Sequence, residues 1–236
     1  MDKSRHTIAG MFNRIAARYD LLNRVLSMGL DIRWRHNMFR LFPAKRPLRV
    51  LDMATGTADV PLMMVDQLGK DVFTHIVGGD ISDQMLEVGR HKVNARGLDG
   101  LIRLENADAT QLEFLDDSFD VVTIAFGIRN VAHVDKALAE FFRVLSPGGR
   151  VLILEFSMPQ NAVIRWGYLM YFRHVLPWVG GLISKDQDAY RYLNRSVEGF
   201  HDRGDFAQLM SDAGFDQVHW ESYCFGVASV YVGDKN

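Results

Sequence analysis

The chain of 236 residues contains one cysteine, Cys224, which excludes an internal disulfide framework and a metal site built from cysteines. Its net charge of −2 lacks the positive excess with which a nucleic-acid-binding protein neutralises phosphates. The N-terminus lacks the apolar segment of a signal peptide. We therefore expect a cytoplasmic globular protein with no nucleic-acid partner.

Long uninterrupted hydrophobic runs are also absent. The most apolar and aromatic stretch, residues 163–184, is interrupted by Arg165, Arg173 and Pro177, whereas a membrane span needs about 20 consecutive apolar residues. Its rings and arginines suit peripheral association of residues 163–182 with the inner face of a membrane, or the wrapping of a lipid tail. A homodimer face or a helical core explains the composition equally well, and these alternatives stay open.

Apolar, β-branched runs alternate with helical patterns along the chain. The runs cover residues 48–53, 72–80, 101–108, 119–126 and 150–156, and two further strands are expected near 217–224 and 227–232. Continuous rather than alternating apolarity indicates strands covered on both faces. The order predicts a doubly wound α/β fold, with a mostly parallel seven-stranded sheet, helices on both faces and an antiparallel C-terminal edge.

The same pattern predicts a single domain over residues 1–236. We expect a helical lid at 1–47, a cofactor-binding core at 48–156, an aromatic helical insert near the substrate at 157–204, and a closing helix and strands at 205–236. Asp59 and Pro61 indicate one helix start, and Ser82 is the expected N-cap of another. Residues 134–145 carry an apolar stripe at helical spacing that ends in SPGG.

Residue types suited to a nucleotide follow four of the expected strands at their carboxyl ends, where such sheets bind ligands. Small residues after the first strand let a ligand approach the backbone, and Asp80 stands where ribose hydroxyls need an acceptor. An NAD site is disfavoured because the first turn lacks G-x-G-x-x-G. For Asp80 taken alone, a solvated carboxylate is the alternative. The candidate cofactor residues are Asp52, Ala54, Gly56, Thr57, Asp80, Ile81, Asp108, Ala109 and Ala125.

Several longer blocks resemble the ubiquinone/menaquinone biosynthesis C-methyltransferases, a family of class I methyltransferases. They are FNRIAARYDLLNRVLSMGLDIRW (12–34), LDMATGTAD (51–59), FGIRNV (126–131), RVLSPGGRVLILEFS (143–157) and DAYRYLNRSV (188–197). The resemblance implies S-adenosylmethionine as methyl donor, S-adenosylhomocysteine as product, and a prenylated quinol as acceptor. A methyl sulfonium is already strongly electrophilic, so this chemistry needs no metal. Whether the acceptor is a benzoquinol or a naphthoquinol stays open.

The resemblance further implies cofactor contacts from Thr57, Asp80, Asp108, Ala109 and the backbone at Ala125. Three positions depart from the family pattern. Ala58 stands where the loop usually ends in glycine, so a positive φ there costs energy. Ala125 replaces a serine, and Asp31 replaces a histidine, which makes Asp31 the departure that bears most on substrate choice.

Three residues are our catalytic candidates. Arg129, just past the fourth strand, is expected to stabilise the quinolate oxygen, and Asn130 to orient the ring or a water. Tyr19 belongs to the segment expected to fold over the site. The alternative for Arg129 is an ion pair with a carboxylate such as Glu155 that merely braces the loop.

Two other functions fit the same residues. One is a methyltransferase of this fold with a different small acceptor, and the other is a catalytically silent cofactor-binding subunit of a quinone-synthesis assembly. Product analysis separates the first from quinol methylation, and an S-adenosylmethionine binding assay separates the second.

Overall fold

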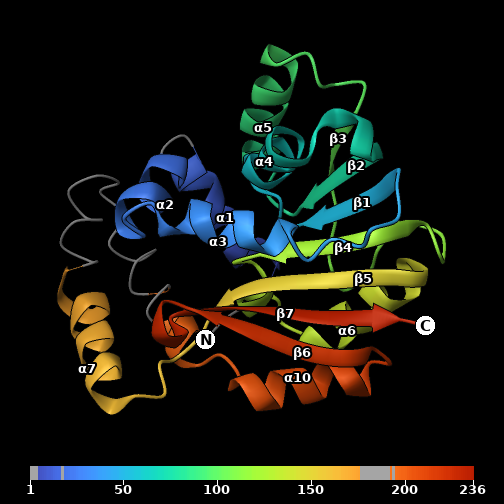
Figure 1. The fold of residues 1–236 in the computed structure, drawn as a ribbon. Helices are drawn as coiled ribbons and strands as arrows, with labels where there is room; N and C mark the ends of the chain where they lie inside the picture. The colour runs from blue at the N-terminus through green and yellow to red at the C-terminus, as the bar shows by residue number, and fades with distance from the viewer. Residues whose placement is uncertain (1–4, 17–18, 176–191, 193–194) are drawn as a thin grey trace.

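The computed structural model of the protein describes residues 5–16, 19–175, 192 and 195–236. Its centre is a seven-stranded sheet in the order β3-β2-β1-β4-β5-β7-β6 (Figure 1). The strands are β1 Leu48–Met53, β2 Phe73–Asp80, β3 Ile102–Asn106, β4 Phe119–Ala125, β5 Leu145–Phe156, β6 Asp216–Tyr223 and β7 Ala228–Lys235. β1 to β5 run parallel, whereas β7 is antiparallel to both of its neighbours. The predicted fold class is confirmed.

Helices cover both faces of the sheet (Figure 1). They are α1 Arg5–Ile15, α2 Tyr19–Leu26, α3 Leu30–Phe39, α4 Asp59–Leu68, α5 Asp83–Ala95, α6 Val134–Val144, α7 Ala162–Met170 and α10 Arg203–Asp212. Apolar residues of α3, α4 and α5 form a core on one face, and those of α6 and α10 form a core on the other. Both faces of β1 are therefore buried, as the continuous apolar run predicts.

The local signals in the sequence act as expected. Ser82 caps α5, since its hydroxyl accepts a hydrogen bond from Met85 N at 3.3 Å, and α4 begins at Asp59. The stripe at 134–145 forms α6, which ends at Val144. β5 begins at Leu145, five residues before the predicted Arg150, because Leu145 already pairs with Phe119 of β4. The SPGG segment lies within the strand, where Gly148 has φ +78° and the register of the pairing with β4 shifts.

The strand order reverses beside β1, because β2 and β3 lie on one side of it and β4 on the other. At this point the loops that follow β1 and β4 nearly touch. A Cβ added to Gly127 would stand 2.4 Å from the Cβ of Ala54, so glycine is required there. Such a reversal leaves a crevice beyond the carboxyl ends of the strands.

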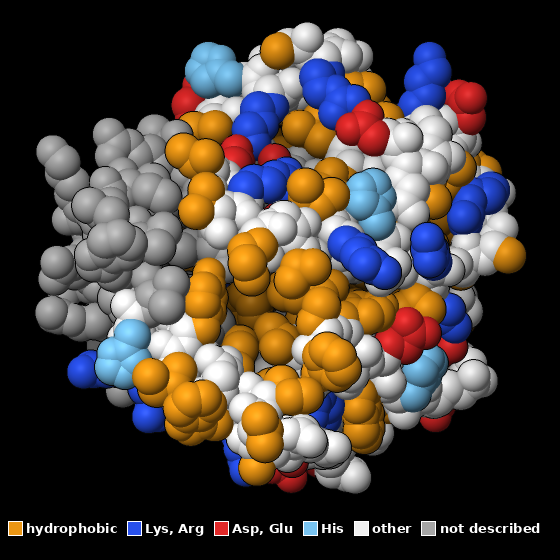
Figure 2. All heavy atoms as spheres, turned by 60° about the vertical axis from the view of Figure 1, so that its left-hand side comes forward, with side chains coloured by type: hydrophobic (Ala, Val, Ile, Leu, Met, Phe, Trp, Pro, Cys, Tyr) orange, Lys and Arg blue, Asp and Glu red, His pale blue; other side chains and the backbone are white. Residues whose placement is uncertain are grey.

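A second hollow lies on the face that Figure 2 turns forward, where hydrophobic side chains gather around a depression. This is the side on which α2 and α7 stand in Figure 1. Among the described residues, no helix is both long and apolar enough to cross a membrane. Residues 176–191 of the predicted insert lie outside the described part, and the division of the domain into four segments stays a prediction.

Candidate active site

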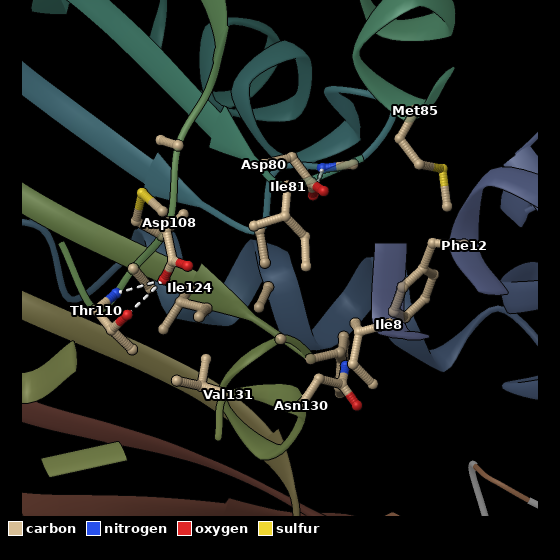
Figure 3. A pocket seen from close by; sticks show the side chains of 18 of the residues that line it. Ile8, Phe12, Asp80, Ile81, Met85, Asp108, Thr110, Ile124, Asn130 and Val131 are labelled. Carbon is tan, nitrogen blue, oxygen red and sulfur yellow. Dashed lines mark hydrogen bonds between the residues drawn. The ribbon is translucent and has the colours of Figure 1, made fainter. Parts of the chain in front are cut away.

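A cavity of about 280 Å³ opens at the carboxyl ends of β1 to β4 (Figure 3). Most residues predicted to contact the cofactor line it, namely Ala54, Gly56, Asp80, Ile81, Asp108, Ala109 and Ala125. Figure 3 shows the carboxylates of Asp80 and Asp108 on separate sides of this space. The strand ends thus gather into one site the residues that the sequence spreads over more than seventy positions.

Asp80 ends β2 and is held by backbone amides. Its Oδ2 accepts a hydrogen bond from Gly56 N at 2.8 Å, and its Oδ1 accepts one from Ser82 N at 2.9 Å. Burial raises the pKa of this carboxyl, while the backbone hydrogen bonds act in the opposite direction. The carboxylate is thereby fixed in position, with oxygen lone pairs left over for a ligand in the cavity.

Asp108 is fixed in a similar way, by the backbone and hydroxyl of Thr110, which donate to its Oδ1 at 2.9 and 2.7 Å. The opposite wall comes from the N-terminal helix α1, which contributes Ile8 and Phe12 (Figure 3). Sequence reasoning missed both of these residues. Phe12 does open the first of the quoted blocks, but nothing in its spacing indicates the side of the helix that faces the cavity.

Two predicted cofactor residues lie outside this lining. Asp52 is 1% exposed, and its Oδ1 accepts a hydrogen bond from the hydroxyl of Thr123 at 2.6 Å. Burial raises the pKa of Asp52 to about 7. The hydroxyl of Thr57 donates to Asp20 and accepts a hydrogen bond from Lys92 Nζ at 3.0 Å. Both side chains contact protein groups behind the cofactor loop rather than the cavity.

The loop itself is strained. Ala54 has φ +51° and Ala58 has φ +63°, both in the left-handed region that glycine tolerates best. The departure from glycine at Ala58 therefore carries the conformational cost expected from the sequence, of about 1–2 kcal/mol. The methyl group of Ala58 is fully buried, so the packing of the loop offsets part of that cost.

A second cavity, of about 340 Å³, adjoins the first and is mostly apolar. Tyr19 and Phe126 line both cavities, so they stand at the boundary between the two spaces. The second cavity lies among α2, α3 and α7, together with the π-helical turn η4 (Tyr171–Val175) and the 3₁₀ turn η5 (Cys224–Gly226). This arrangement offers one space for a nucleotide and an adjoining, more apolar space for a second ligand.

Arg129 lies on the 3₁₀ turn η3 (Ile128–Asn130) and lines the second cavity. Its Nη1 donates to Glu155 Oε1 at 2.8 Å, so the ion pair weighed as the alternative role does form. Burial raises the pKa of Glu155, and the Arg129 cation opposes this rise. The Arg129 Nε is buried and has no hydrogen-bond partner among the described residues. One side of the guanidinium therefore braces the loop while a further donor stays unused.

Asn130 and Tyr19 are the other two catalytic candidates. Asn130 lines the first cavity, and its Oδ1 accepts a hydrogen bond from the Tyr192 hydroxyl at 3.0 Å. Tyr190 and Arg191, which precede Tyr192 in the chain, lie outside the described residues. Burial raises the pKa of Tyr19, so its phenol is a hydrogen-bond donor rather than a base near neutral pH.

Charged residues join α2 and α3 to the core. Asp31 is buried and accepts hydrogen bonds from Arg24 at 2.9 Å and from the Ser27 hydroxyl at 2.7 Å. Arg35 Nη1 lies 3.4 Å from Asp31 and 3.5 Å from Asp59. Asp31 and Arg35 line the second cavity, so one of the three positions that depart from the family pattern faces this space.

Solved structures share this architecture. A SAM-dependent methyltransferase from Thermotoga maritima superposes with a TM-score of 0.66 at 19% identity, over 96% of this chain and 99% of its own. The fold is therefore that of the class I methyltransferases.

Sequence comparisons identify the family. The model of the ubiE/COQ5 methyltransferase family matches residues 1–235. A demethylmenaquinone methyltransferase of Thermus thermophilus is 48% identical over 225 residues, which cover 95% of this chain and 100% of the relative. A ubiquinone/menaquinone biosynthesis C-methyltransferase of Geobacter sulfurreducens is 46% identical over 228 residues, which cover 97% and 88% of the two chains. The chain belongs to the ubiE/COQ5 methyltransferase family and is an S-adenosylmethionine-dependent methyltransferase.

The raised pKa of Asp80 leads to a prediction about cofactor binding. An ionised carboxylate accepts hydrogen bonds from ribose hydroxyls, so protonation removes affinity. We expect the dissociation constant of S-adenosylmethionine to be constant above this pKa and to rise about tenfold per pH unit below it. Calorimetric titration at stepped pH measures the effect.

Asp80→Asn and Asp52→Asn form a matched pair of variants for this experiment. Asp80→Asn should bind more weakly at neutral pH and lose the pH dependence. Asp52, whose pKa is raised to about 7, lies outside the cavity, so Asp52→Asn should keep the dependence. The opposite result would move the titrating group from Asp80 to Asp52.

Proposed function

We propose that this chain transfers a methyl group from S-adenosylmethionine to a ring carbon of a prenylated quinol, as in menaquinone or ubiquinone biosynthesis. The carrying observation is the pair of adjoining cavities that share Tyr19 and Phe126, one with carboxylates for a nucleoside and the other apolar with buried arginines. The names of the related proteins support the reaction class. A demethylated naphthoquinol is the acceptor that the Thermus relative's name favours.

The first cavity fits the cofactor by its chemistry. Asp80 offers an anchored acceptor for ribose hydroxyls, and Asp108 with Ala109 offers an acceptor and a flat apolar surface for adenine. The small residues Ala54 and Gly56 leave room beside the loop backbone. S-adenosylmethionine, when bound, supplies an electrophilic methyl group. The role of the protein is to align it with a carbon nucleophile and to exclude water, and alignment contributes several kcal/mol.

Arg129 acts on the acceptor in this proposal. A phenol titrates near 10 in water, and a nearby cation lowers such a pKa by about 1–3 units, or roughly 1.4–4 kcal/mol towards the reactive anion. Arg129 supplies this cation at the wall of the second cavity, with Glu155 holding its Nη1. Loss of the phenolic proton makes the neighbouring ring carbon nucleophilic. Formation of the carbon–carbon bond would break the methyl carbon–sulfur bond of the donor, with S-adenosylhomocysteine as leaving group, and the methylated ring carbon then releases its hydrogen as a proton.

Tyr19 and Asn130 position the reacting groups. The phenol of Tyr19 stands where the two cavities meet, and its raised pKa keeps it protonated as a donor. Asn130, held by Tyr192, lines the first cavity and orients the ring or the water that accepts the proton. Both side chains act as neutral groups in this proposal.

Product analysis tests the proposal. The purified protein is incubated with isotope-labelled S-adenosylmethionine and either reduced demethylmenaquinol or a methoxy-prenyl-benzoquinol. The extracted lipids are then analysed by mass spectrometry. We expect label on a ring carbon of at least one quinol. Label on oxygen, or cofactor binding without a labelled quinol, would favour a different acceptor. Absence of cofactor binding would favour a silent subunit.

Arg129→Lys tests the cation at the acceptor. Lysine keeps the charge but cannot bond Glu155 and reach the acceptor with one planar group, so we expect turnover to fall at least about tenfold. Glu155→Gln is the control, because it breaks the brace and keeps the cation. It should lower the melting temperature while losing less activity than Arg129→Lys. Equal losses in the two variants would reduce Arg129 to a structural brace.

The rim of the second cavity supports association with a membrane surface. Trp166 on α7 is 67% exposed, Phe225 on η5 is 82% exposed, and Met28 in the turn between α2 and α3 is also exposed. Phe225 and Met28 line the cavity that would receive a lipid-soluble quinol. We therefore assign residues 163–175 of the predicted 163–182 segment to this rim, since 176–182 lie outside the described residues. A homodimer through the same face stays a competing prediction.

Vesicle binding tests the membrane surface. Replacing Trp166 and Phe225 together by serine should reduce co-sedimentation with phosphatidylcholine–phosphatidylglycerol vesicles by about tenfold or more, because each aromatic ring buries apolar area. Trp220→Ser is the matched control, since Trp220 is a partly exposed tryptophan on β6, away from the rim. Unchanged vesicle binding together with a shift from dimer to monomer would assign the face to dimerisation instead.

A further inference from the structure

The second cavity contains a buried cation besides Arg129. Arg35 lies on α3, is 5% exposed and lines the same cavity. Its guanidinium carbon lies 6.0 Å from the centre of the Phe126 ring, and that of Arg129 lies 5.4 Å from the centre of the Phe156 ring. The two rings contact each other, with their centres 4.6 Å apart. The cavity therefore has an arginine beside each of two touching aromatic rings.

Arg35 has hydrogen-bonding capacity that the described residues do not use. Its Nε and Nη1 are buried and have no hydrogen-bond partner within the described part of the chain. Nη1 is near Asp31 and Asp59, at 3.4 and 3.5 Å, so the charge is balanced while the donors stay unsatisfied. A buried donor without an acceptor costs about 1–3 kcal/mol, and a ligand that supplies the acceptor recovers that energy.

We propose that Arg35 binds the second ring oxygen of the acceptor, the oxygen that is not adjacent to the methylated carbon. A quinol carries two oxygens on opposite sides of its ring, and one cation can serve only the oxygen next to the reacting carbon. Arg129 serves that oxygen in the proposed function, on which this inference rests. Arg35 makes the cavity specific for a dihydroxy ring over a ring with one hydroxyl.

A purely structural role for Arg35 is the competing explanation, and Arg24 provides the comparison. Arg24 donates to the same two carboxylates, Asp31 at 2.9 Å and Asp59 at 3.2 Å, with well-formed hydrogen bonds. It is not part of the lining of the second cavity. A change at Arg24 therefore disturbs the charge cluster without removing a donor from the acceptor space.

The test compares two short-tailed acceptors, a prenylated 1,4-naphthoquinol and the matching prenylated 1-naphthol, which keeps the oxygen beside the reacting carbon and lacks the other. The ratio of kcat/KM for the two acceptors is measured in wild type, Arg35→Gln and Arg24→Gln. We expect Arg35→Gln to reduce the preference for the quinol by about tenfold to a hundredfold, the value of a hydrogen bond to a charged group. Arg24→Gln should keep the wild-type ratio.

Equal ratios in wild type and Arg35→Gln, with S-adenosylmethionine affinity unchanged, would overturn the inference. If Arg35→Gln does not fold, wild-type dissociation constants for the two acceptors, measured with S-adenosylhomocysteine as the nucleotide, make the same comparison. A difference below about threefold would then refute the role of Arg35. Failure of the proposed function is distinct, because wild type would then methylate neither ring.

Discussion

The ion pairs of the Asp59 carboxylate are the interactions on which the arrangement of the two cavities depends. Asp59 begins α4 directly behind the cofactor loop, where a negative charge also stabilises the N-terminus of the helix. Arg24 from α2 and Lys92 from α5 donate to it at 3.2 and 2.8 Å, and Arg35 from α3 lies 3.5 Å away. Three helices, α2, α3 and α5, are thereby held to the residue that follows the loop after β1, and α2 and α3 carry part of the lining of the second cavity.

The charged groups around Asp59 are partly or fully buried, so their charges have to be balanced within the cluster. Lys92 also contacts Asp20, so three cations (Arg24, Arg35 and Lys92) face three carboxylates (Asp20, Asp31 and Asp59). The desolvation that makes a lone buried ion costly is met by this balance. The charges of the cluster balance, but Nε and Nη1 of Arg35 have no well-formed hydrogen bond to any described residue. The acceptor cavity thus presents hydrogen-bond donors without carrying a large unpaired charge.

The gathering of the candidate cofactor residues around one cavity could be predicted from the sequence because a parallel sheet brings its strand ends together. Asp80, Asp108 and Ala125 follow different strands and still line one cavity. That the side chains of Asp52 and Thr57 face away from the cavity could not be predicted, since their orientation depends on a loop in which Ala54 and Gly56 both have positive φ. Those dihedral angles decide which side chains face the ligand and which face the core.

The pairing of Arg129 with Glu155 could be foreseen as an alternative because Arg129 closely follows β4 and Glu155 ends the next strand in the chain, β5, which lies beside β4 in the sheet. Arg35 could not. It lies one residue beyond the first quoted block, and its role depends on where α3 stands relative to α7 and η5, which are more than a hundred residues away in the chain. Long-range placement of this kind leaves no periodic signal in the sequence.

Asp31 connects the departure in the sequence to the chemistry of the acceptor cavity. Where the family pattern has histidine, this chain places a buried carboxylate that accepts from Arg24 and Ser27 and lies beside Arg35. A neutral imidazole would leave three cations facing two carboxylates, and Arg24 and Arg35, which both contact Asp31, would share the excess charge. With Asp31, Arg35 acts as a hydrogen-bond donor of balanced charge. In the proposed function, stabilisation of the quinolate then falls to Arg129, whose buried Nε also has no hydrogen-bond partner among the described residues.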